Sequence, residues 1–489
     1  MLFNSYIFLM AFLPVTWLIY FGLNRFGKYK LATGGLIAAS FVFYGYLNWR
    51  LCLLLAASIL MNYMLHCALT GKARRKAQRK LMLWLGLAFN FGLLFCFKYF
   101  NFTIENINAV TGSQFALRNI ALPLGISFYT FQQVSFVVDS YRGDIKRYQF
   151  LEYALFVSFF PQLVAGPIVL HSEMIPQFAD RRKRQVNFSN LLPGMEYLIF
   201  GLAKKVILAD SFGRICDAGY AAVRNLNSVS AIAVILSYTL EIYFDFSGYC
   251  DMAVGIGKLF NIEIPVNFRS PYKAVNIGEF WKRWHITLTR FLTTYLYIPL
   301  GGSRGGKWKT YRNVMIVFTL SGLWHGADWS FVVWGMLHGV MMVLYRMNKE
   351  RVDRLPKWFS WLLTFGFLNV AWAFFGMESV VQPIKLFAMV ILGGFGGFTQ
   401  TILDAICGKN LLITLAGYLV SENVMGLLMQ LVTTIWLVGG TVVCVAAPSS
   451  HEIVERKYRK QGYYFLLALV FILSVIRLSQ VSKFIYFNF

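Results

Sequence analysis

The chain has 489 residues, of which 57% are hydrophobic and only 14% are charged. Soluble domains carry about 25% charged residues, so the composition excludes a soluble globular protein and indicates an integral membrane protein.

The formal net charge is +24. A nucleic-acid-binding protein would gather such charge on one soluble basic face, but here the basic residues bunch between apolar segments, at 72–80, 181–184 and 456–460. We therefore expect no nucleic-acid partner, and we expect these three runs to be cytoplasmic loops.

Apolar segments follow one another along the whole chain, and no polar stretch is long enough to fold separately. A membrane-crossing helix needs about 20 apolar residues. The sequence therefore predicts an all-α polytopic membrane protein, a single domain over 1–489 with about 11 to 12 transmembrane helices. The candidate spans lie near 5–23, 31–48, 51–69, 81–100, 150–170, 191–210, 229–247, 311–345, 358–377, 383–399, 427–447 and 463–480.

The first and last of these spans give the predicted orientation. Segment 5–23 has no preceding basic region and no small-residue cleavage site, so it is a spanning helix and not a cleaved signal. Basic residues follow it at 25–30, which places the N-terminus outside. The run 456–460 precedes the last span in the same way, so we expect both termini to be extracytoplasmic.

Two apolar segments are irregular. The stretch 311–345 exceeds one crossing and contains Gly322, Gly326 and Gly335, so we expect two pieces or a re-entrant turn. The stretch 119–140 contains Pro, Gly and several amide and hydroxyl groups. Lipid cannot satisfy those groups, which favours a partly buried or re-entrant helix.

The segment LSGLWHGADWSFVVWGMLHG at 320–339 places two histidines and an aspartate among apolar side chains. Polar groups inside a membrane are costly, so each needs a partner or a task. His325 precedes Gly326, which predicts an accessible neutral imidazole able to accept a proton from an attacking hydroxyl. The alternative is a core histidine hydrogen-bonded to a carbonyl or to Asp328. In a continuous helix His338 would not share a face with His325, so we expect no metal site.

A third histidine lies in NIGEFWKRWHITLTRFLTTYLYIPLGGSR, residues 276–304. Asn276 followed by Glu279 is typical of a helix start. Beyond it, one helical stripe carries a mixed aromatic and cationic set, namely Trp281, Lys282, His285 and Thr289. This stripe predicts a wall for an anionic ligand such as a phosphate-bearing cofactor. The alternative is an interfacial amphipathic helix with snorkelling cations.

Glu241 and Asp245 lie four residues apart and so share one helix face. Such a pair can act as an acid/base device. Paired carboxylates in membrane interiors more often neutralise Lys or Arg on a neighbouring helix, and we favour that interpretation.

Four motifs together resemble one known family. FFPQLVAGPI, YFDFSGYCDMAVGIGKLF, the 276–304 segment and the 320–339 segment occur in the order and spacing of the bacterial branch of the membrane-bound O-acyltransferases. The likeness covers essentially the whole chain. Within the branch, the chain is most similar to the membrane proteins of alginate and peptidoglycan O-acetylation, and the teichoic acid D-alanyltransferase is a shorter relative.

The resemblance implies a ring of tilted helices, with re-entrant or interfacial helices, around a central tunnel. An acyl group, in the first place acetyl from acetyl-CoA, would pass from the cytoplasm to an extracytoplasmic acceptor. The acceptor would be an exported or cell-wall polysaccharide, reached through an extracytoplasmic SGNH-type partner. The protein would lie among the lipids of the bacterial cytoplasmic (inner) membrane.

The resemblance also implies roles for individual residues. His325 matches the catalytic histidine of the family, and His285 matches a second position thought to assist. The residues expected to contact the donor are Trp281, Lys282, Arg283 and Arg304. The segment 463–489 resembles a companion protein of the D-alanylation system, fused here to the enzyme. In its tail FIYFNF, only Tyr486 carries a nucleophilic oxygen, which makes it a candidate acyl relay or, alternatively, an aromatic anchor.

Three other functions stay open from the sequence. The chain could transfer D-alanyl groups to another cell-envelope polymer. Broken helices and a polar site in the membrane also suit a transporter or flippase, although the sequence has no internal repeat. An inactive scaffold for polysaccharide synthesis would tolerate the loss of His325.

Overall fold

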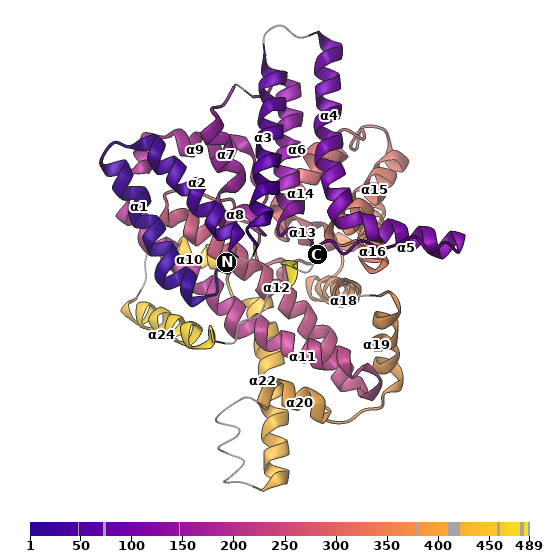
Figure 1. The fold of residues 1–489 in the computed structure, drawn as a ribbon. Coiled ribbons are helices and arrows are strands. Elements are labelled where there is room, and N and C mark those ends of the chain that lie inside the picture. The colour runs from indigo at the N-terminus through magenta and orange to yellow at the C-terminus, as the bar shows by residue number, and fades with distance from the viewer. Residues whose placement is uncertain are drawn as a thin grey trace. The chain divides into compact units, whose positions relative to one another are not determined.

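The computed structural model describes residues 1–46, 48–71, 75–145, 147–377, 379–408, 421–456, 460–479 and 484–487. Within these ranges every regular element is a helix (Figure 1). The all-α prediction is therefore confirmed. Parts of two predicted loops and of the tail, at 72–74, 457–459, 480–483 and 488–489, lie outside the described residues.

Seven described helical stretches are long and apolar enough to cross a membrane, which agrees with a multi-pass membrane protein. They are Phe8–Arg25, Arg50–Thr70, Lys76–Thr111, Ser228–Leu259, Trp329–Met347, Lys357–Phe375 and Glu422–Ala446. Val381–Leu392 and Gln461–Arg477 are shorter apolar helices. Other predicted spans are broken, as at 150–170, where α7 (Phe150–Ser158) gives way to α8 (Phe160–Leu163).

The described residues form two compact units. Unit 1 comprises Met1–Gly201, Tyr249–Asn267 and the described residues from 460 to 487. Its helices are η1 (Phe8–Phe12), α1 (Leu13–Arg25), α2 (Tyr29–Gly45), α3 (Arg50–Thr70), α4 (Lys76–Leu94), η2 (Phe95–Tyr99), α5 (Phe100–Thr111), α6 (Ile126–Arg142), α7, α8, α9 (His171–Ala179), η3 (Arg181–Arg184), most of α10 (Phe188–Ala203), the end of α12 (Ser228–Leu259), α24 (Gln461–Arg477) and η8 (Ile485–Phe487).

Unit 2 comprises Leu202–Gly248 and the described residues from 268 to 456. Its helices are η4 (Lys204–Ala209), α11 (Asp210–Ala221), η5 (Val223–Asn225), the first part of α12, η6 (Pro271–Lys273), α13 (Ile277–Arg283), α14 (Ile286–Leu292), η7 (Thr293–Tyr297), α15 (Lys307–His325), α16 (Trp329–Met347), α17 (Lys349–Asp353), α18 (Lys357–Phe375), α19 (Val381–Leu392), α20 (Gln400–Cys407), α22 (Glu422–Ala446) and α23 (Ser450–Val454).

A polar network joins the helices α3, α4, α6 and α7 of unit 1, and the first three lie side by side in Figure 1. Asn62 Nδ2 donates to Asn90 Oδ1 (3.1 Å) and to Gln133 Oε1 (2.8 Å), and Asn90 Nδ2 donates back to Asn62 Oδ1 (2.7 Å). Gln133 Nε2 donates to Ser58 Oγ (2.9 Å), and the Tyr153 hydroxyl donates to Gln133 Oε1 (3.1 Å). The Gln133 amide of the 119–140 stretch is thus satisfied inside protein, as the sequence predicts, whereas Gln132 Oε1 is buried without a hydrogen-bond partner among the described residues.

Removal of the central amide should therefore weaken unit 1. We expect Asn62→Leu to lower the free energy of unfolding by about 1–3 kcal/mol, because the Asn90 and Gln133 amides lose buried partners. Thermal unfolding of the protein in detergent measures the change. Asn24 is also buried, and its amide donates to the Tyr20 carbonyl of its own helix (2.9 Å), so Asn24→Leu is the matched control. Equal melting temperatures for the two variants would show that the network adds no stability.

Segment 311–345 forms two helices, α15 and α16, as the glycines predict. A Cβ on Gly322 would collide with the Phe331 carbonyl oxygen, and one on Gly335 would collide with the Phe318 carbonyl oxygen. Because these obstacles are backbone atoms, only glycine lets the two helices approach so closely. The close contact places the end of α15 firmly against α16.

Candidate active site

His325 is the last residue of α15, and its side chain is buried, at 3% exposed. Its Nδ1 lies 2.6 Å from the carbonyl oxygen of Ser321, one turn earlier. A carbonyl can only accept a hydrogen bond, so Nδ1 must carry the hydrogen. In the neutral ring the lone pair is then on Nε2, which is the atom able to take a proton.

Aromatic rings surround the imidazole of His325. The ring centroids of Trp324, Trp334 and Phe375 lie 4.8, 5.0 and 5.3 Å from its own. The expectation that Gly326 leaves the histidine accessible is wrong. A Cβ at this position would collide with the Phe331 ring, so the glycine makes room for a packed aromatic side chain, and the imidazole is enclosed.

His285 lies between α13 and α14, and its ring centroid is 6.4 Å from that of His325, at an interplanar angle of 71°. Its φ of 44° and ψ of 52° place it in the left-handed region, which is uncommon for a residue with a Cβ. The predicted continuous stripe from Trp281 to Thr289 is thus interrupted at His285. Such a strained backbone is typical of functional sites, and here it brings the two histidine rings together.

The start of this segment follows the sequence prediction. Asn276 Oδ1 accepts a hydrogen bond from the Glu279 backbone N–H (2.8 Å), and α13 begins at Ile277. Helix α13 ends at Arg283, whose carbonyl accepts a hydrogen bond from the backbone N–H of Arg269 (3.0 Å). That long-range contact has no signature in the local sequence.

The neighbours proposed for His325 have other roles. Asp328 does not orient the imidazole, because the chain leaves the helix at Gly326 and the Asp328 carboxylate accepts from the Ser330 N–H (2.7 Å) to cap α16. His338 lies on α16, with the Trp334 ring packed against both histidine rings. Neither nitrogen of His338 has a hydrogen-bond partner among the described residues. Within those residues, no three His, Cys, Asp or Glu side chains gather as a metal site would require.

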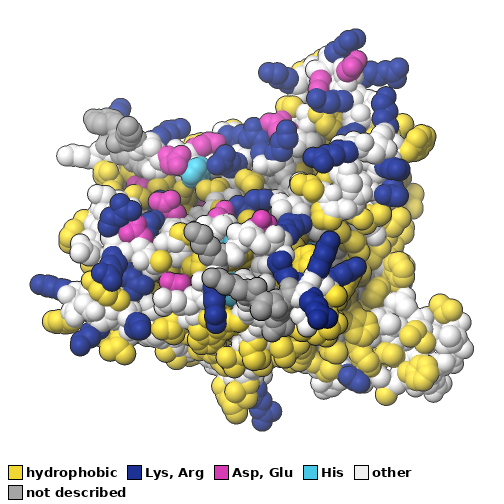
Figure 2. Space-filling view, turned by 90° about the horizontal axis from the view of Figure 1, so that it is seen from above, with side chains coloured by type: hydrophobic (Ala, Val, Ile, Leu, Met, Phe, Trp, Pro, Cys, Tyr) yellow, Lys and Arg dark blue, Asp and Glu magenta, His cyan; other side chains and the backbone are white. Residues whose placement is uncertain are grey.

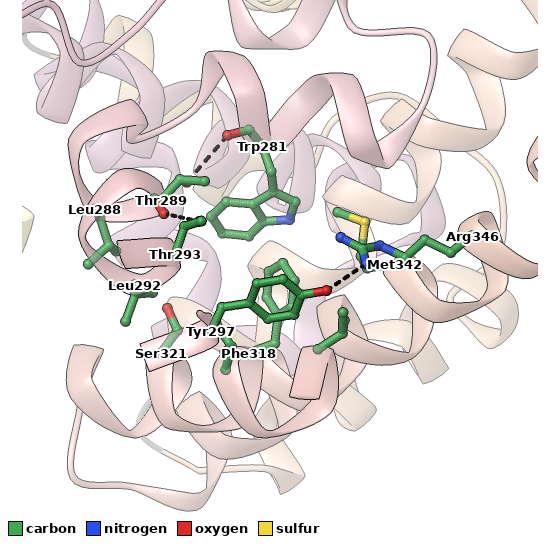
Figure 3. Close-up of a pocket in the computed structure, with 12 residues that line it drawn as sticks. Trp281, Leu288, Thr289, Leu292, Thr293, Tyr297, Phe318, Ser321, Met342 and Arg346 are labelled. Atoms are coloured by element: carbon green, nitrogen blue, oxygen red, sulfur yellow. Dashed lines mark hydrogen bonds between the residues drawn. The ribbon is translucent and has the colours of Figure 1, made fainter. Parts of the chain in front are cut away.

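A hollow of about 180 Å³, here the apolar chamber, is shown in Figure 3. Ser321, whose carbonyl accepts from His325, is part of its wall, and the buried Trp281 ring borders it from α13. Thr289 Oγ1 donates to the Trp281 carbonyl across the break at His285 (3.3 Å). The full lining is Trp281, Leu288, Thr289, Leu292, Thr293, Tyr297, Val314, Val317, Phe318, Ser321, Met342 and Arg346.

A second, larger hollow of about 570 Å³, here the basic mouth, shares Trp281, Thr289, Met342 and Arg346 with the apolar chamber. It adds the exposed side chains of Lys282 and Lys349. It also includes one carboxylate, that of Glu279, which is paired with Arg283. Arg346 Nη1 donates to the Tyr297 hydroxyl (3.1 Å) (Figure 3). Arg346 and Lys349 were not among the predicted donor residues, because cations at the end of a span look like ordinary loop charges.

The other predicted donor contacts lie elsewhere in unit 2. Arg283 is paired with Glu279 (Nη2 to Oε1, 2.7 Å) and also donates to the Arg269 carbonyl (3.2 Å). Arg304 is exposed in the turn that follows η7. Neither residue lines the apolar chamber or the basic mouth, so their predicted role stays a prediction.

Tyr486 belongs to unit 1, whereas both histidines belong to unit 2. The described part of the tail, 484–487, is packed and not exposed. The Phe484 ring meets the Tyr249 ring of α12 edge-on at 4.8 Å, and Tyr486 is buried. Its position is thus that of a core residue of the chain.

The carboxylate pair on α12 has cationic and thiol neighbours. Lys205 Nζ lies 2.6 Å from Asp245 Oδ1 and 3.0 Å from Asp210 Oδ1. The Cys216 thiol lies near Glu241 and donates to the Val234 carbonyl (3.9 Å). Asp245 therefore neutralises a lysine of a neighbouring helix, as the interpretation favoured from the sequence expects of the pair. The described residues show no such ion pair for Glu241.

Lys and Arg side chains are spread over the face shown in Figure 2, with fewer Asp and Glu side chains between them. This distribution agrees with the net charge of +24. Exposed apolar side chains such as Leu18, Leu53, Ile435 and Phe465 lie on the apolar helices instead. The surface thus has the two kinds of side chain that lipid and its headgroups require.

A family model described as the membrane-bound O-acyltransferase family matches residues 41–380. The chain belongs to the membrane-bound O-acyltransferase family. It is therefore an O-acyltransferase, and family membership favours this activity over the transporter alternative. His325, His285, the apolar chamber and the basic mouth all fall inside the matched region.

Several relatives are named acyltransferases. The chain is 42% identical to the peptidoglycan O-acetyltransferase of Helicobacter pylori, over 81% of this chain and 80% of the relative. It is 36% identical to a probable alginate O-acetylase, AlgI, of Azotobacter vinelandii, over 83% of this chain and 80% of the relative. A teichoic acid D-alanyltransferase of Streptococcus thermophilus is 26% identical over 51% of this chain and 69% of the relative.

Proposed function

We propose that this O-acyltransferase moves an acetyl group from cytoplasmic acetyl-CoA to an extracytoplasmic acceptor for the O-acetylation of an exported or cell-wall polysaccharide. The observation that carries the proposal is the hydrogen bond from His325 Nδ1 to the Ser321 carbonyl. It gives the imidazole one tautomer, with Nε2 as the base, in a site closed by aromatic rings.

The proposed reaction needs a base and an oxyanion stabiliser. His325 Nε2 takes the proton of the attacking hydroxyl while the hydroxyl oxygen bonds to the thioester carbonyl carbon. The C–S bond then breaks, and the proton passes to the departing thiolate. His285, whose ring lies close to that of His325, is the proposed donor to the developing oxyanion.

The two hollows support a thioester donor with a phosphate-bearing head. Lys282, Arg346 and Lys349 give the basic mouth three cations, whereas the apolar chamber is narrow and mostly lined by hydrocarbon. The chamber alone is smaller than the roughly 300–1,000 Å³ of ordinary ligand pockets. We therefore assign the charged head to the mouth and the thioester arm to the chamber, which leads toward the turn that holds His325.

The relatives suggest the acceptor class. The names of the Helicobacter and Azotobacter proteins specify peptidoglycan and alginate, so we propose a polysaccharide acceptor reached through an extracytoplasmic SGNH-type partner. D-alanyl transfer is the second candidate, because the teichoic acid enzymes also match. Their lower identity and coverage favour acetyl.

We further propose that 463–489 acts as a fused companion segment and that Tyr486 relays the acetyl group. In sealed vesicles that contain the protein and its partner, the label of [acetyl-14C]acetyl-CoA should reach the glycan, whereas Tyr486→Phe should abolish that transfer and keep the buried ring. The melting temperature of the variant serves as the folding control. Normal glycan labelling in Tyr486→Phe would show direct transfer without a relay. Absence of label on any acceptor with the unmodified chain would contradict the acetyltransferase proposal itself.

We also propose that the protein lies in the bacterial inner membrane with both termini outside. Arg75, at the start of α4, is exposed and adjoins the predicted cytoplasmic loop. A cysteine introduced by Arg75→Cys should react with a membrane-impermeant thiol reagent only after the cytoplasmic side is opened. The comparison requires a background in which the exposed Cys96 is replaced by serine. Labelling in intact cells would reverse the proposed orientation.

A further inference from the structure

A third hollow, of about 370 Å³, lies between η5 and the start of α19 in unit 2, far along the chain from the donor residues. We call it the anion hollow. Four polar side chains line it, together with the Tyr220 ring: Arg224, Asn225, Gln382 and Lys385. All four of these side chains are exposed, so a ligand from solvent can reach them.

The polar groups of the anion hollow are not engaged by the protein. Arg224 and Lys385 form no ion pair among the described residues, and the side chains of Asn225 and Gln382 form no hydrogen bond there. The lining contains no carboxylate. A guanidinium, an ammonium and two amides are therefore available to one ligand, and a guanidinium can bind a carboxylate through two parallel hydrogen bonds.

The anion hollow is held in shape by its surroundings. Asn227 Nδ2 donates to the Gly397 carbonyl (2.6 Å), and the Ser228 N–H donates to the Gly394 carbonyl (2.9 Å). The Thr399 N–H donates to Ser230 Oγ (2.9 Å). These bonds tie the start of α12, directly after η5, to the chain that follows α19, so the two segments that carry the lining residues are held near each other.

Helix α18 separates the anion hollow from the basic mouth. This helix is long and apolar enough to cross a membrane. Lys349 of the mouth lies shortly before its start at Lys357, and Gln382 lies shortly after its end at Phe375. The two hollows are therefore at opposite ends of one span. If the mouth receives the cytoplasmic donor, the anion hollow faces the acceptor side.

Helix α22 places the anion hollow on the same side independently. Its Gln430 is hydrogen-bonded to the backbone of Phe398 through both amide atoms (2.8 and 3.0 Å), beside the segment that anchors Asn227. The other end of α22 leads to 456–460, which the charge pattern predicts to be cytoplasmic. The anchored end is thus extracytoplasmic.

We propose that the anion hollow binds a carboxylate-bearing sugar unit of the acceptor glycan. Arg224 and Lys385 hold the carboxylate, Asn225 and Gln382 hold hydroxyl groups, and the Tyr220 ring supports the apolar face of the sugar. The ligand class rests on the proposed function, because only a glycan acceptor brings such a unit to this side. The hollow positions the glycan and takes no part in the acyl transfer itself.

The test measures binding of trigalacturonate to the full-length protein in nanodiscs of neutral lipid, with maltotriose as the uncharged comparison. We expect trigalacturonate to bind and maltotriose not to bind. Arg224→Gln and Lys385→Gln should each weaken trigalacturonate binding roughly tenfold, as expected for the loss of a charge-assisted hydrogen bond. Arg351→Gln, an exposed cation at α17, is the matched control and should bind as the unmodified chain does.

Three outcomes would overturn the proposal. Unchanged trigalacturonate affinity in both Arg224→Gln and Lys385→Gln would show that the anion hollow is not the binding site. An equal loss of trigalacturonate affinity in Arg351→Gln would show that the effect comes from the overall positive charge of the surface and not from the anion hollow. Displacement of trigalacturonate by equimolar inorganic phosphate would show a phosphate or headgroup site instead. His325→Ala should bind trigalacturonate normally, so a failure of the proposed chemistry would appear in acetyl transfer and leave this binding result in place.

Discussion

His325→Ala is expected to lower acetyl transfer by about 10²- to 10⁴-fold, the usual contribution of a positioned general base. The physical reason is the loss of Nε2, which carries the lone pair of the neutral ring because Nδ1 donates its hydrogen to the Ser321 carbonyl. Transfer from labelled acetyl-CoA by the purified variant measures the effect. Circular dichroism and the melting temperature establish that the helices are retained.

His338→Phe is the matched control for this variant. His338 is also buried, lies in the same aromatic cluster and shares the Trp334 ring with His325. Its nitrogens have no hydrogen-bond partner among the described residues, so a phenyl ring preserves its packing. We expect near-normal transfer. A loss as large as that of His325→Ala would mean that disturbance of the cluster, and not removal of a base, explains both variants.

The double variant Lys282→Gln with Arg346→Gln is expected to raise the KM for acetyl-CoA roughly 10- to 100-fold with little change in kcat. Hydrogen bonds to charged groups contribute about 1.5–3 kcal/mol each, and exposure to solvent and salt reduces that figure at the mouth. Initial rates against donor concentration, at low and at moderate salt, provide the measurement. The increase should shrink as the salt concentration rises.

Acetyl-pantetheine supplies an internal control, because it keeps the thioester arm and lacks the nucleotide phosphates. Its KM should be the same for the double variant and the unmodified chain. The sequence also proposed Arg304 for the donor, but this residue does not line either hollow. Arg304→Gln therefore distinguishes the two assignments, and a KM increase as large as that of the double variant would favour the sequence-based set over the basic mouth.

Local signals in the sequence were enough to predict most of the helical framework. The cap formed by Asn276 depends on residues three apart, and the break after His325 coincides with Gly326. The structural role of Gly326 could not be predicted from the sequence, because the Phe331 ring that packs against it comes from the next helix. Close contacts between helices are decided in three dimensions, so periodicity shows where a helix lies but not what its glycines face.

The candidate site was predictable in part. The polar residues of an apolar chain stand out, which is why His325 and His285 drew attention, and the resemblance to the family implied their roles. Arg346 and Lys349 did not stand out, since basic residues are expected at the ends of spans. The left-handed backbone at His285 was also missed, because a non-glycine residue seldom adopts it and nothing in the local sequence marks it.

The bond between His325 and Ser321 joins two residues of the same helical turn. The orientation of the imidazole is therefore set within α15 and does not depend on an acceptor from another helix. If α15 tilts or slides during a catalytic cycle, the ring travels with it as one rigid piece, with its protonated nitrogen still facing its own backbone. A transferase built in this way can alternate between two substrates by moving a helix without having to rebuild its base at each turnover.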